Sequence, residues 1–209
     1  MKIYDLTIAL SGKTIVYPGC DAFECKCLSS VEKGDACSTH SFGMMNHAGT
    51  HIDFPAHMLD GGKTSSDYEL SYLMGSGLII EISENEKIIT DEFLKNADIQ
   101  ENDIVLFKTS NSKLWAKAEF SAEFVCLDIS AAKYLVDKKV KIAGIDYLSV
   151  DAVDNSKFPV HKELLANNVL IIENVNLVDV PAGRYKIYVA PLNIPDMDGL
   201  PARVFAQGE

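Results

Sequence analysis

A cluster of histidines in the first third of the chain constrains its fold more than any other feature. His47, His51, Asp53 and His57 follow the pattern H-x3-H-x-D-x3-H, which places three of the five histidines within eleven residues. The spacing of His47 and His51 would suit one face of a helix. However, Gly49 and a proline inside the window both disfavour a helix interior. We therefore expect a turn at Gly49 followed by an extended segment, on which His51 and Asp53 project from the same face.

This combination of side chains is typical of a metal site. Imidazole nitrogens and carboxylate oxygens suit Zn²⁺, Mn²⁺ or Fe²⁺, and several imidazoles crowded around a carboxylate are electrostatically unfavourable without a cation. Because neighbouring residues alone rarely complete such a site, His161 and Glu173 are further candidate ligands. The alternatives are an exposed helix residue for His161 and a capping acid at a strand end for Glu173. His40 is interpreted as an ordinary polar residue.

The composition excludes several classes of protein. The chain has 209 residues, of which 47% are hydrophobic and 23% charged, and its net charge is −11. The hydrophobic fraction excludes disorder, and a negative charge without a basic cluster argues against nucleic-acid binding. No stretch approaches the ~20 apolar residues of a membrane span, and the N-terminus lacks a signal-peptide pattern. We expect one domain over residues 1–209 in the cytoplasm, with its five cysteines reduced.

Strand patterns dominate the N-terminal half and alternate with helical patterns later in the chain. Phe23, Cys25 and Cys27 share one face of a strand that we expect to be half-buried. The order of the patterns favours a mixed α/β fold in which a β-rich part meets a β/α part. The expected strands cover residues 3–10, 23–28, 38–46, 76–83, 103–108, 140–145, 169–173, 184–191 and 203–206, and the expected helices begin at Thr90 and cover 130–138 and 159–167.

The histidine window resembles the diagnostic motif of the metal-dependent cyclase family, whose best-known branch is bacterial kynurenine formamidase (arylformamidase). The resemblance extends over nearly the whole chain, and its segments occur in the family's order. Besides the window they are Y-D-L-T at 4–7, V-Y-P-G at 16–19, G-x-D-x-x-S-x-D at 144–151, I-E-N at 172–174 and D-G-x-P-x-R at 198–203.

The resemblance implies a fold, an assembly and a metal site. The fold would be a mixed sheet with a β-barrel-like core and a smaller packed sheet plus helices, assembled as a homodimer or a larger homo-oligomer. One or two Zn²⁺ ions would be bound, whereas branches that hydrolyse cyclic substrates such as isatin use one Mn²⁺. The residue matching His57 would be the proton shuttle. The metal ligands would be the residues matching His47, His51, Asp53, His161 and Glu173.

The implied activity is hydrolysis of a small-molecule amide, with N-formylkynurenine-type aryl formamides giving an aromatic amine and formate. The alternative activities are a cyclic amide or imide hydrolase of the same family and a cyclase or dehydratase. A non-enzymatic alternative is a structural zinc site, which would have a closed shell of four ligands with no open position. Tyr17 and Cys20 stand where formamidases tend to have Trp and an acid, and Tyr17 would stack on a substrate ring. Arg203 would pair with a substrate carboxylate or form a surface ion pair. Neither nucleic acid nor a membrane is expected as a partner.

Overall fold

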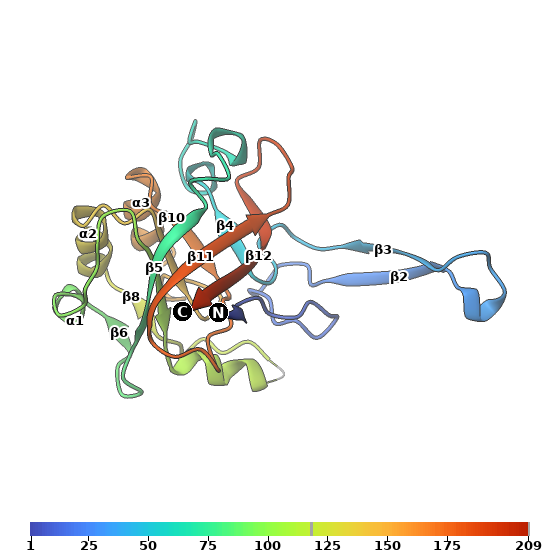
Figure 1. The fold of residues 1–209 in the computed structure, drawn as a ribbon, viewed down its shortest axis with the longest axis horizontal. Helices are drawn as coiled ribbons and strands as arrows, with labels where there is room; N and C mark the ends of the chain where they lie inside the picture. Colours follow the sequence, from blue (N-terminus) through green and yellow to red (C-terminus); the bar gives the residue numbers. More distant parts are fainter. Residues whose placement is uncertain (118, 209) are drawn as a thin grey trace.

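Seven strands close into a barrel in the computed structural model, which describes residues 1–117 and 119–208 (Figure 1). β4 pairs with both β10 and β12 and thereby closes the ring, while β1 (Lys2–Asp5) pairs with β12. The mixed fold with a barrel-like core that the sequence predicts is confirmed. In order around the barrel, the strands are β12 (Gly199–Gly208), β11 (Gly183–Pro191), β5 (Met74–Glu81), β7 (Ile104–Lys108), β9 (Ile142–Ile145), β10 (Leu170–Glu173) and β4 (His51–Asp53).

Four neighbouring strands of the barrel, β5, β7, β9 and β10, run parallel to one another. Parallel neighbours need long crossover connections, which usually contain a helix. The three connections contain α1 (Asp91–Leu94), α2 (Ile129–Asp137) and α3 (Pro159–Ala166), which lie together on one side of the barrel (Figure 1). The helix predicted at 130–138 begins one residue earlier, because the Asp128 side chain accepts a hydrogen bond from the Ala131 N–H at 3.0 Å.

Strand β7 shows how two hydrophobic layers form around the barrel wall. Successive side chains of a strand point to opposite faces. Ile104 and Leu106 therefore pack in the barrel interior, while Val105 and Phe107 pack in the layer beneath the helices. All four side chains are fully buried, so both faces of this strand are covered.

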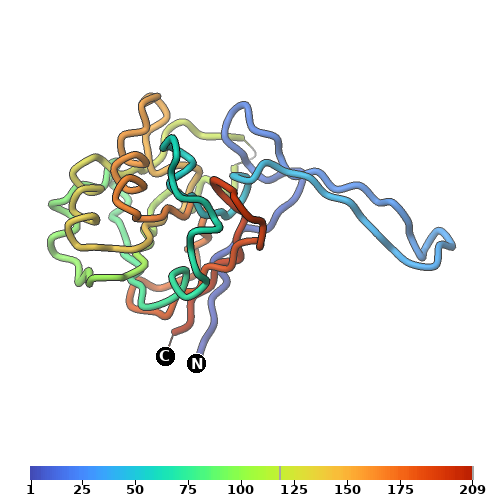
Figure 2. Tube along the Cα trace, turned by 90° about the horizontal axis from the view of Figure 1, so that it is seen from above, coloured from blue at the N-terminus to red at the C-terminus, as the bar shows by residue number. Residues whose placement is uncertain are grey.

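Two smaller sheets lie outside the barrel. β6 (Ile88–Ile89) pairs with β8 (Cys126–Leu127), and β2 (Glu24–Ser29) pairs with β3 (Thr39–Gly43). The β2–β3 hairpin, residues 24–43, projects away from the barrel (Figures 1 and 2); we call it the arm. Short 3-10 helices complete the architecture as η1 (Val31–Lys33), η2 (Pro55–His57), η3 (Ser65–Asp67) and η4 (Ser110–Ala116).

Several sequence predictions differ from the structure, and the strand predicted at 38–46, for example, ends at Gly43. The strand predicted at 3–10 ends at Asp5, because the backbone N–H of Ile8 donates to the Thr50 hydroxyl instead of to a neighbouring strand. The last strand is longer than predicted, since Gly199 and Pro201 are accommodated in its pairing with β4. The prediction that the strand carrying Cys25 and Cys27 is half-buried is wrong, because both thiols are exposed on the arm.

No helix in the described ranges 1–117 and 119–208 is both long enough and apolar enough to cross a membrane.

The barrel wall is tightly packed around Gly77. A β-carbon on Gly77 would lie 2.3 Å from Cδ1 of Ile187 and 2.8 Å from the carbonyl oxygen of Ile104. Gly77→Ala should therefore lower the free energy of unfolding by about 1–3 kcal/mol. In Gly12→Ala, the added β-carbon would meet its nearest neighbour at 3.9 Å, and stability should change by less than about 1 kcal/mol. Equal urea midpoints for the two variants would contradict the close approach at Gly77.

Candidate metal centre

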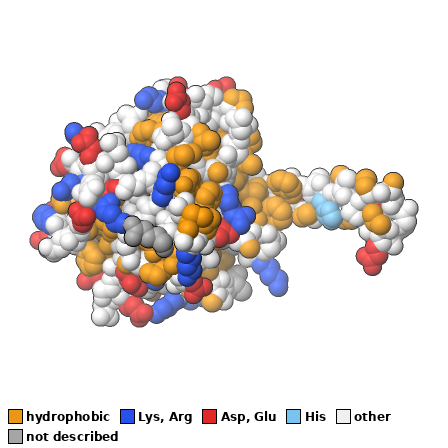
Figure 3. All heavy atoms as spheres, viewed as in Figure 1, with side chains coloured by type: hydrophobic (Ala, Val, Ile, Leu, Met, Phe, Trp, Pro, Cys, Tyr) orange, Lys and Arg blue, Asp and Glu red, His pale blue; other side chains and the backbone are white. Residues whose placement is uncertain are grey.

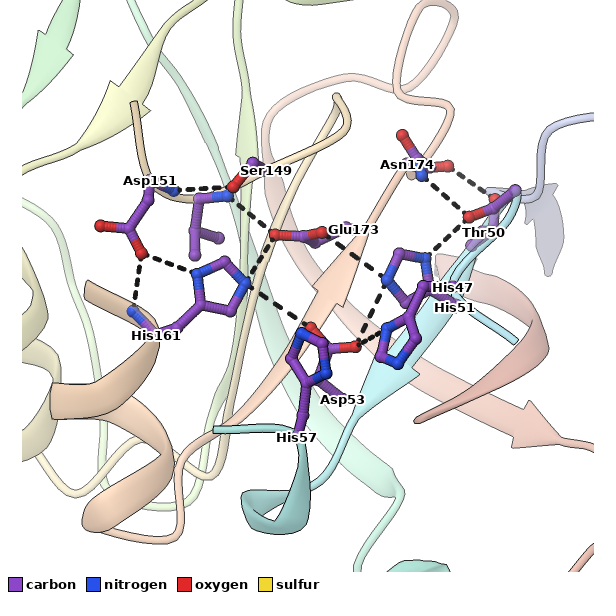
Figure 4. Close-up of polar contacts among 12 residues, drawn as sticks. His47, Thr50, His51, Asp53, His57, Ser149, Asp151, His161, Glu173 and Asn174 are labelled. Atoms are coloured by element: carbon purple, nitrogen blue, oxygen red, sulfur yellow. Dashed lines mark hydrogen bonds and ion pairs between the residues drawn. The ribbon is translucent and has the colours of Figure 1, made fainter. Parts of the chain in front are cut away.

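Two neighbouring strands bring three of the predicted ligands together. Ile52 packs in the barrel interior, so His51 and Asp53 on either side of it point to the opposite face of β4. Glu173, the last residue of β10, lies opposite His51 in the register of the two strands. His51 Nε2 lies 3.3 Å from Asp53 Oδ1 and 3.6 Å from Glu173 Oε2 (Figure 4). The extended segment predicted after Gly49 is therefore present as β4.

Helix α3 supplies the fourth side chain. His161 lies in its first turn and is buried, with Nε2 3.2 Å from Glu173 Oε1 and 3.8 Å from Asp53 Oδ2 (Figure 4). The crossover from β9 to β10 thus carries a histidine back over the carboxyl end of β10. Residues more than a hundred positions apart in sequence converge on one point.

The remaining two histidines flank Asp53 on its other side. His47 precedes β4, and its Nδ1 lies 2.8 Å from Asp53 Oδ1. η2 turns the chain directly after β4 and brings the ring of His57 to 4.1 Å from the ring of His47, centroid to centroid. Ligand atoms of two groups lie within 4.8 Å of one another, His51–Asp53–Glu173 and His47–Asp53–His57. Asp53 belongs to both groups, so its carboxylate lies between the two clusters of candidate donor atoms.

The carboxylate of Asp53 fits a bound cation. Asp53 is fully buried, and among the described residues its oxygens have histidine nitrogens as close polar neighbours, with His47 Nδ1 at 2.8 Å, but no hydrogen bond of good geometry. Burial of an ionised carboxylate without compensation costs several kcal/mol or more. Imidazole nitrogens of histidine surround it, and together they form the mixed N and O donor set that Zn²⁺ and related divalent ions prefer.

The neighbouring carboxylates also raise the pKa values of two histidines in this site. Burial disfavours the charged form of His161, but Glu173, Asp151 and Asp53 outweigh it and raise the pKa of His161 to about 10. Burial is likewise outweighed at His47, whose pKa the carboxylates raise to about 9. Carboxylates that stabilise protonated histidines also attract a divalent cation. Binding of that cation by the histidines requires that their ring nitrogens lose these protons.

Hydrogen bonds from the other ring nitrogens orient the two most buried histidines. Nδ1 of His51 lies 2.9 Å from the carbonyl oxygen of Gly49, and Nδ1 of His161 lies 2.7 Å from Asp151 Oδ2. With Nδ1–H donating in each case, Nε2 is the nitrogen that faces the carboxylates, and once it has lost its proton it can offer its lone pair to a cation held beside them. Asp151 also accepts the backbone N–H groups of Val160 and His161, which fixes it at the start of α3.

Asn174 fastens the strand end next to Glu173 to the turn before β4. The side-chain amide of Asn174 donates to the backbone carbonyl oxygen of Gly49 at 2.9 Å. The backbone carbonyl oxygen of Asn174 accepts a hydrogen bond from the Thr50 hydroxyl at 2.6 Å. Glu173 Oε1 accepts the backbone N–H of Val150 at 2.8 Å. The two Asn174 bonds therefore connect the end of β10 to the turn before β4, and the Val150 bond fixes the Glu173 carboxylate against the segment that follows β9.

Sequence reasoning did not assign a role to Asp151 or Asp198, although both fall in the motifs of the family resemblance. Oδ2 of Asp198 lies 2.9 Å from His47 Nε2 and 3.4 Å from His57 Nδ1. Asp198 therefore bridges the two flanking histidines. The positions of Asp151 and Asp198 in the G-x-D-x-x-S-x-D and D-G-x-P-x-R segments were the signal that the sequence offered. Asp198 contacts histidines that are more than a hundred positions away, and Asp151 contacts His161 only because the loop before α3 folds back on the start of that helix.

A pocket of about 260 Å³ opens above these groups. Tyr17, which was expected to stack on a substrate ring, lies in its wall. Arg203 lies elsewhere, in a different groove, and its guanidinium pairs with the carboxylate of Asp5, with Nε donating at 2.9 Å. Apart from its histidines, Glu173 and Ser149, the pocket is lined by Tyr17, Cys20, Met45, Met58, Leu148 and Phe158.

Comparison with known proteins gives consistent results. The family model described as "Putative cyclase" matches residues 4–152. Kynurenine formamidase of Bacillus anthracis is 31% identical over 203 residues, which cover 97% of this chain and 95% of that protein. A solved structure described as "The Structure Of Potential Metal-Dependent Hydrolase With Cyclase Activity" is 35% identical, with a TM-score of 0.80 and coverage of 98% of this chain and 96% of the other.

A solved structure of lower sequence identity shares the fold. Isatin hydrolase A from Ralstonia solanacearum is 24% identical, with a TM-score of 0.84 and coverage of 98% of this chain and 91% of the other. By sequence and by structure, the chain belongs to the cyclase family of metal-dependent hydrolases.

Proposed function

We propose that this enzyme hydrolyses the formyl C–N bond of N-formylkynurenine-type aryl formamides and releases an aromatic amine and formate. The observation that carries the proposal is the pair of ligand groups sharing Asp53 at the base of an apolar pocket of about 260 Å³. A full-length relative that is a kynurenine formamidase supports the substrate class.

The proposed ligands form two sets that meet at Asp53. One set consists of His51, His161 and Glu173 with Asp53. The other consists of His47 with Asp53. One or two Zn²⁺ ions would be held here, with Mn²⁺ as the alternative. A divalent metal in this position lowers the pKa of water toward ~7 and polarises the carbonyl group of an amide.

His57 is proposed as the group that moves the proton. Burial, reinforced by His47 and His161, lowers the pKa of His57 despite the opposing effect of Asp53, so the ring is neutral at pH 7. A neutral imidazole can take a proton from the attacking water and return it to the leaving nitrogen as the C–N bond breaks. Asp198, 3.4 Å from Nδ1 of His57, would orient the ring so that its other nitrogen faces the substrate.

The pocket wall favours an aromatic substrate. Tyr17 packs edge-on against Phe120 with ring centroids 5.5 Å apart, and Phe158 packs edge-on against His161 at 5.9 Å. Aromatic pairs add about 0.5–1.5 kcal/mol beyond their buried area. Two rings held in place by neighbours therefore provide surfaces on which the aryl group of a formamide would pack.

A cyclic amide hydrolase is the second candidate, because the chain shares its fold with isatin hydrolase A. Both reactions would use the same ligands and the same proton carrier. The two differ only in whether the nitrogen leaves the molecule or stays tethered to it, so a panel of substrates separates them.

Activity assays of chelated and metal-loaded protein test the proposal. Protein stripped by a chelator and reloaded separately with Zn²⁺ or Mn²⁺ should release kynurenine from N-formylkynurenine, and the stripped sample should not. The aryl formamidase assignment fails if protein that verifiably contains metal is inactive on N-formylkynurenine. Turnover of isatin by the same sample would then favour the cyclic amide hydrolase.

Substitution of His57 separates proton transfer from metal binding. His57→Ala should retain its metal and lose about 10²–10⁴-fold in kcat, the range expected for loss of a general acid or base. The matched variant His47→Ala removes a proposed ligand, so it should lose metal as well as activity. Metal content by atomic emission and turnover should be measured on the same samples. If His57→Ala is purified without metal while His47→Ala retains it, the two roles are reversed.

A further inference from the structure

The pocket above the candidate metal ligands differs in charge from the outer surface of the molecule. The chain has 19 Lys and Arg residues and 30 Asp and Glu residues, and such side chains are scattered over the face drawn in Figure 3. None of the described Lys and Arg residues lines the pocket, and Glu173 is the one Asp or Glu among the described residues that do. Because Glu173 and the histidines belong to the candidate metal centre, Tyr17 and Cys20 are the titratable groups of the remaining wall.

These two wall residues are uncharged at pH 7. Burial raises the pKa of the Cys20 thiol, and the neighbouring Asp21 adds to the effect. Burial also raises the pKa of the Tyr17 phenol, with a further contribution from Glu173. The ordinary pKa values of a thiol and a phenol already lie above neutrality. Tyr17 and Cys20 can therefore donate hydrogen bonds to a substrate but offer it no charge.

The pocket is small, and its uncharged wall reaches the opening. Its volume of about 260 Å³ lies below the range of about 300–1,000 Å³ that is typical of ligand pockets. Leu148 and Ser149 are buried, whereas the other non-ligand wall residues are partly exposed and therefore line the opening. These partly exposed residues are Tyr17, Cys20, Met45, Met58 and Phe158.

The wall disfavours a charged group on the substrate. If the formyl group of an aryl formamide lies at the candidate metal ligands, a substituent on the far side of the ring extends past the residues of the opening. An ammonium or carboxylate group on that substituent would lose water against apolar side chains. Desolvation of an ion without an opposite charge is costly, and the wall residues of the opening supply no such charge.

We propose that the preferred substrates are aryl formamides whose ring substituents carry no charge, and that the neutral side chain of Cys20 helps to set this preference. The inference rests on the proposed function, because it concerns the substrates of that same site. A ketone or another neutral acceptor on the ring could accept a hydrogen bond from the Tyr17 hydroxyl. An amino-acid tail, with its ammonium and carboxylate groups, would be tolerated less well.

Three formamides with the same ring and different tails test the preference. 2′-Formamidoacetophenone has an uncharged methyl ketone, N-formylkynuramine carries an ammonium group, and N-formylkynurenine carries both an ammonium and a carboxylate group. On metal-loaded protein, kcat/KM for the uncharged compound should exceed that for each charged compound by at least about tenfold. An equal or higher kcat/KM for either charged compound would overturn the proposal. Protein that verifiably contains metal and hydrolyses none of the three would contradict the proposed function itself, and the inference would fall with it.

Substitution of Cys20 tests its part in the preference. Cys20→Asp places a carboxylate at the opening, so kcat/KM for N-formylkynuramine relative to 2′-formamidoacetophenone should rise about three- to tenfold. Cys20→Asn has nearly the same shape without the charge and should not raise this ratio. Cys37→Asp adds the same charge in an exposed loop of the arm and should leave the ratio unchanged. Metal content is measured on every sample. A ratio that is the same in Cys20→Asp and Cys20→Asn would overturn the role of Cys20.

Binding of reaction products gives the same comparison without turnover. 2′-Aminoacetophenone and kynuramine are the amines released from the uncharged and the cationic formamide. Calorimetry on metal-loaded wild-type protein should give a Kd for 2′-aminoacetophenone that is lower by at least about tenfold. In Cys20→Asp the difference should narrow because the affinity for kynuramine increases. Tighter binding of kynuramine than of 2′-aminoacetophenone by the wild type would contradict the proposal.

Discussion

The buried carboxylate of Asp53 is the constraint on which the rest of the site depends. Asp53 lies on the strand that closes the barrel, opposite Ile171 on one neighbour and Gly199 on the other. Closure of the barrel therefore removes this carboxylate from water, and the nitrogens nearest to its oxygens are those of histidines, with His47 Nδ1 at 2.8 Å. The histidines and the second carboxylate converge where a cation would offset that cost. Barrel closure and the metal centre are consequences of the same short strand.

Local pattern was enough to predict the backbone structure of the histidine window. The window from His47 to His57 contains a turn, an extended segment and a second turn, and each is specified by residues within it. His161 and Glu173 could only be candidates, since their position depends on α3 crossing back over β10. Asp151 and Asp198 received no role, because each acts through a histidine whose approach depends on the fold: His161 is ten residues from Asp151, and His47 is far from Asp198 in sequence.

The arm shows the limit of such patterns in another way. The alternation from Phe23 to Cys27 correctly predicted a strand, and the exposure of that strand in the single chain contradicted the expected burial. Periodicity indicates that a face should be covered, but it does not say by which molecule. The Asp5–Arg203 pair is a similar case, because a guanidinium in the sequence can serve a ligand or a neighbouring strand, and here β1 supplies the carboxylate.

Anomalous diffraction from crystals of the Zn²⁺-loaded protein, recorded on both sides of the zinc absorption edge, tests the central role of Asp53 most directly. The account predicts a zinc peak in contact with the Asp53 carboxylate that also contacts His51 and Glu173. A second peak, if present, should lie between Asp53 and His47. Zinc bound only elsewhere, with the Asp53 oxygens occupied by protein or water donors, would contradict the account.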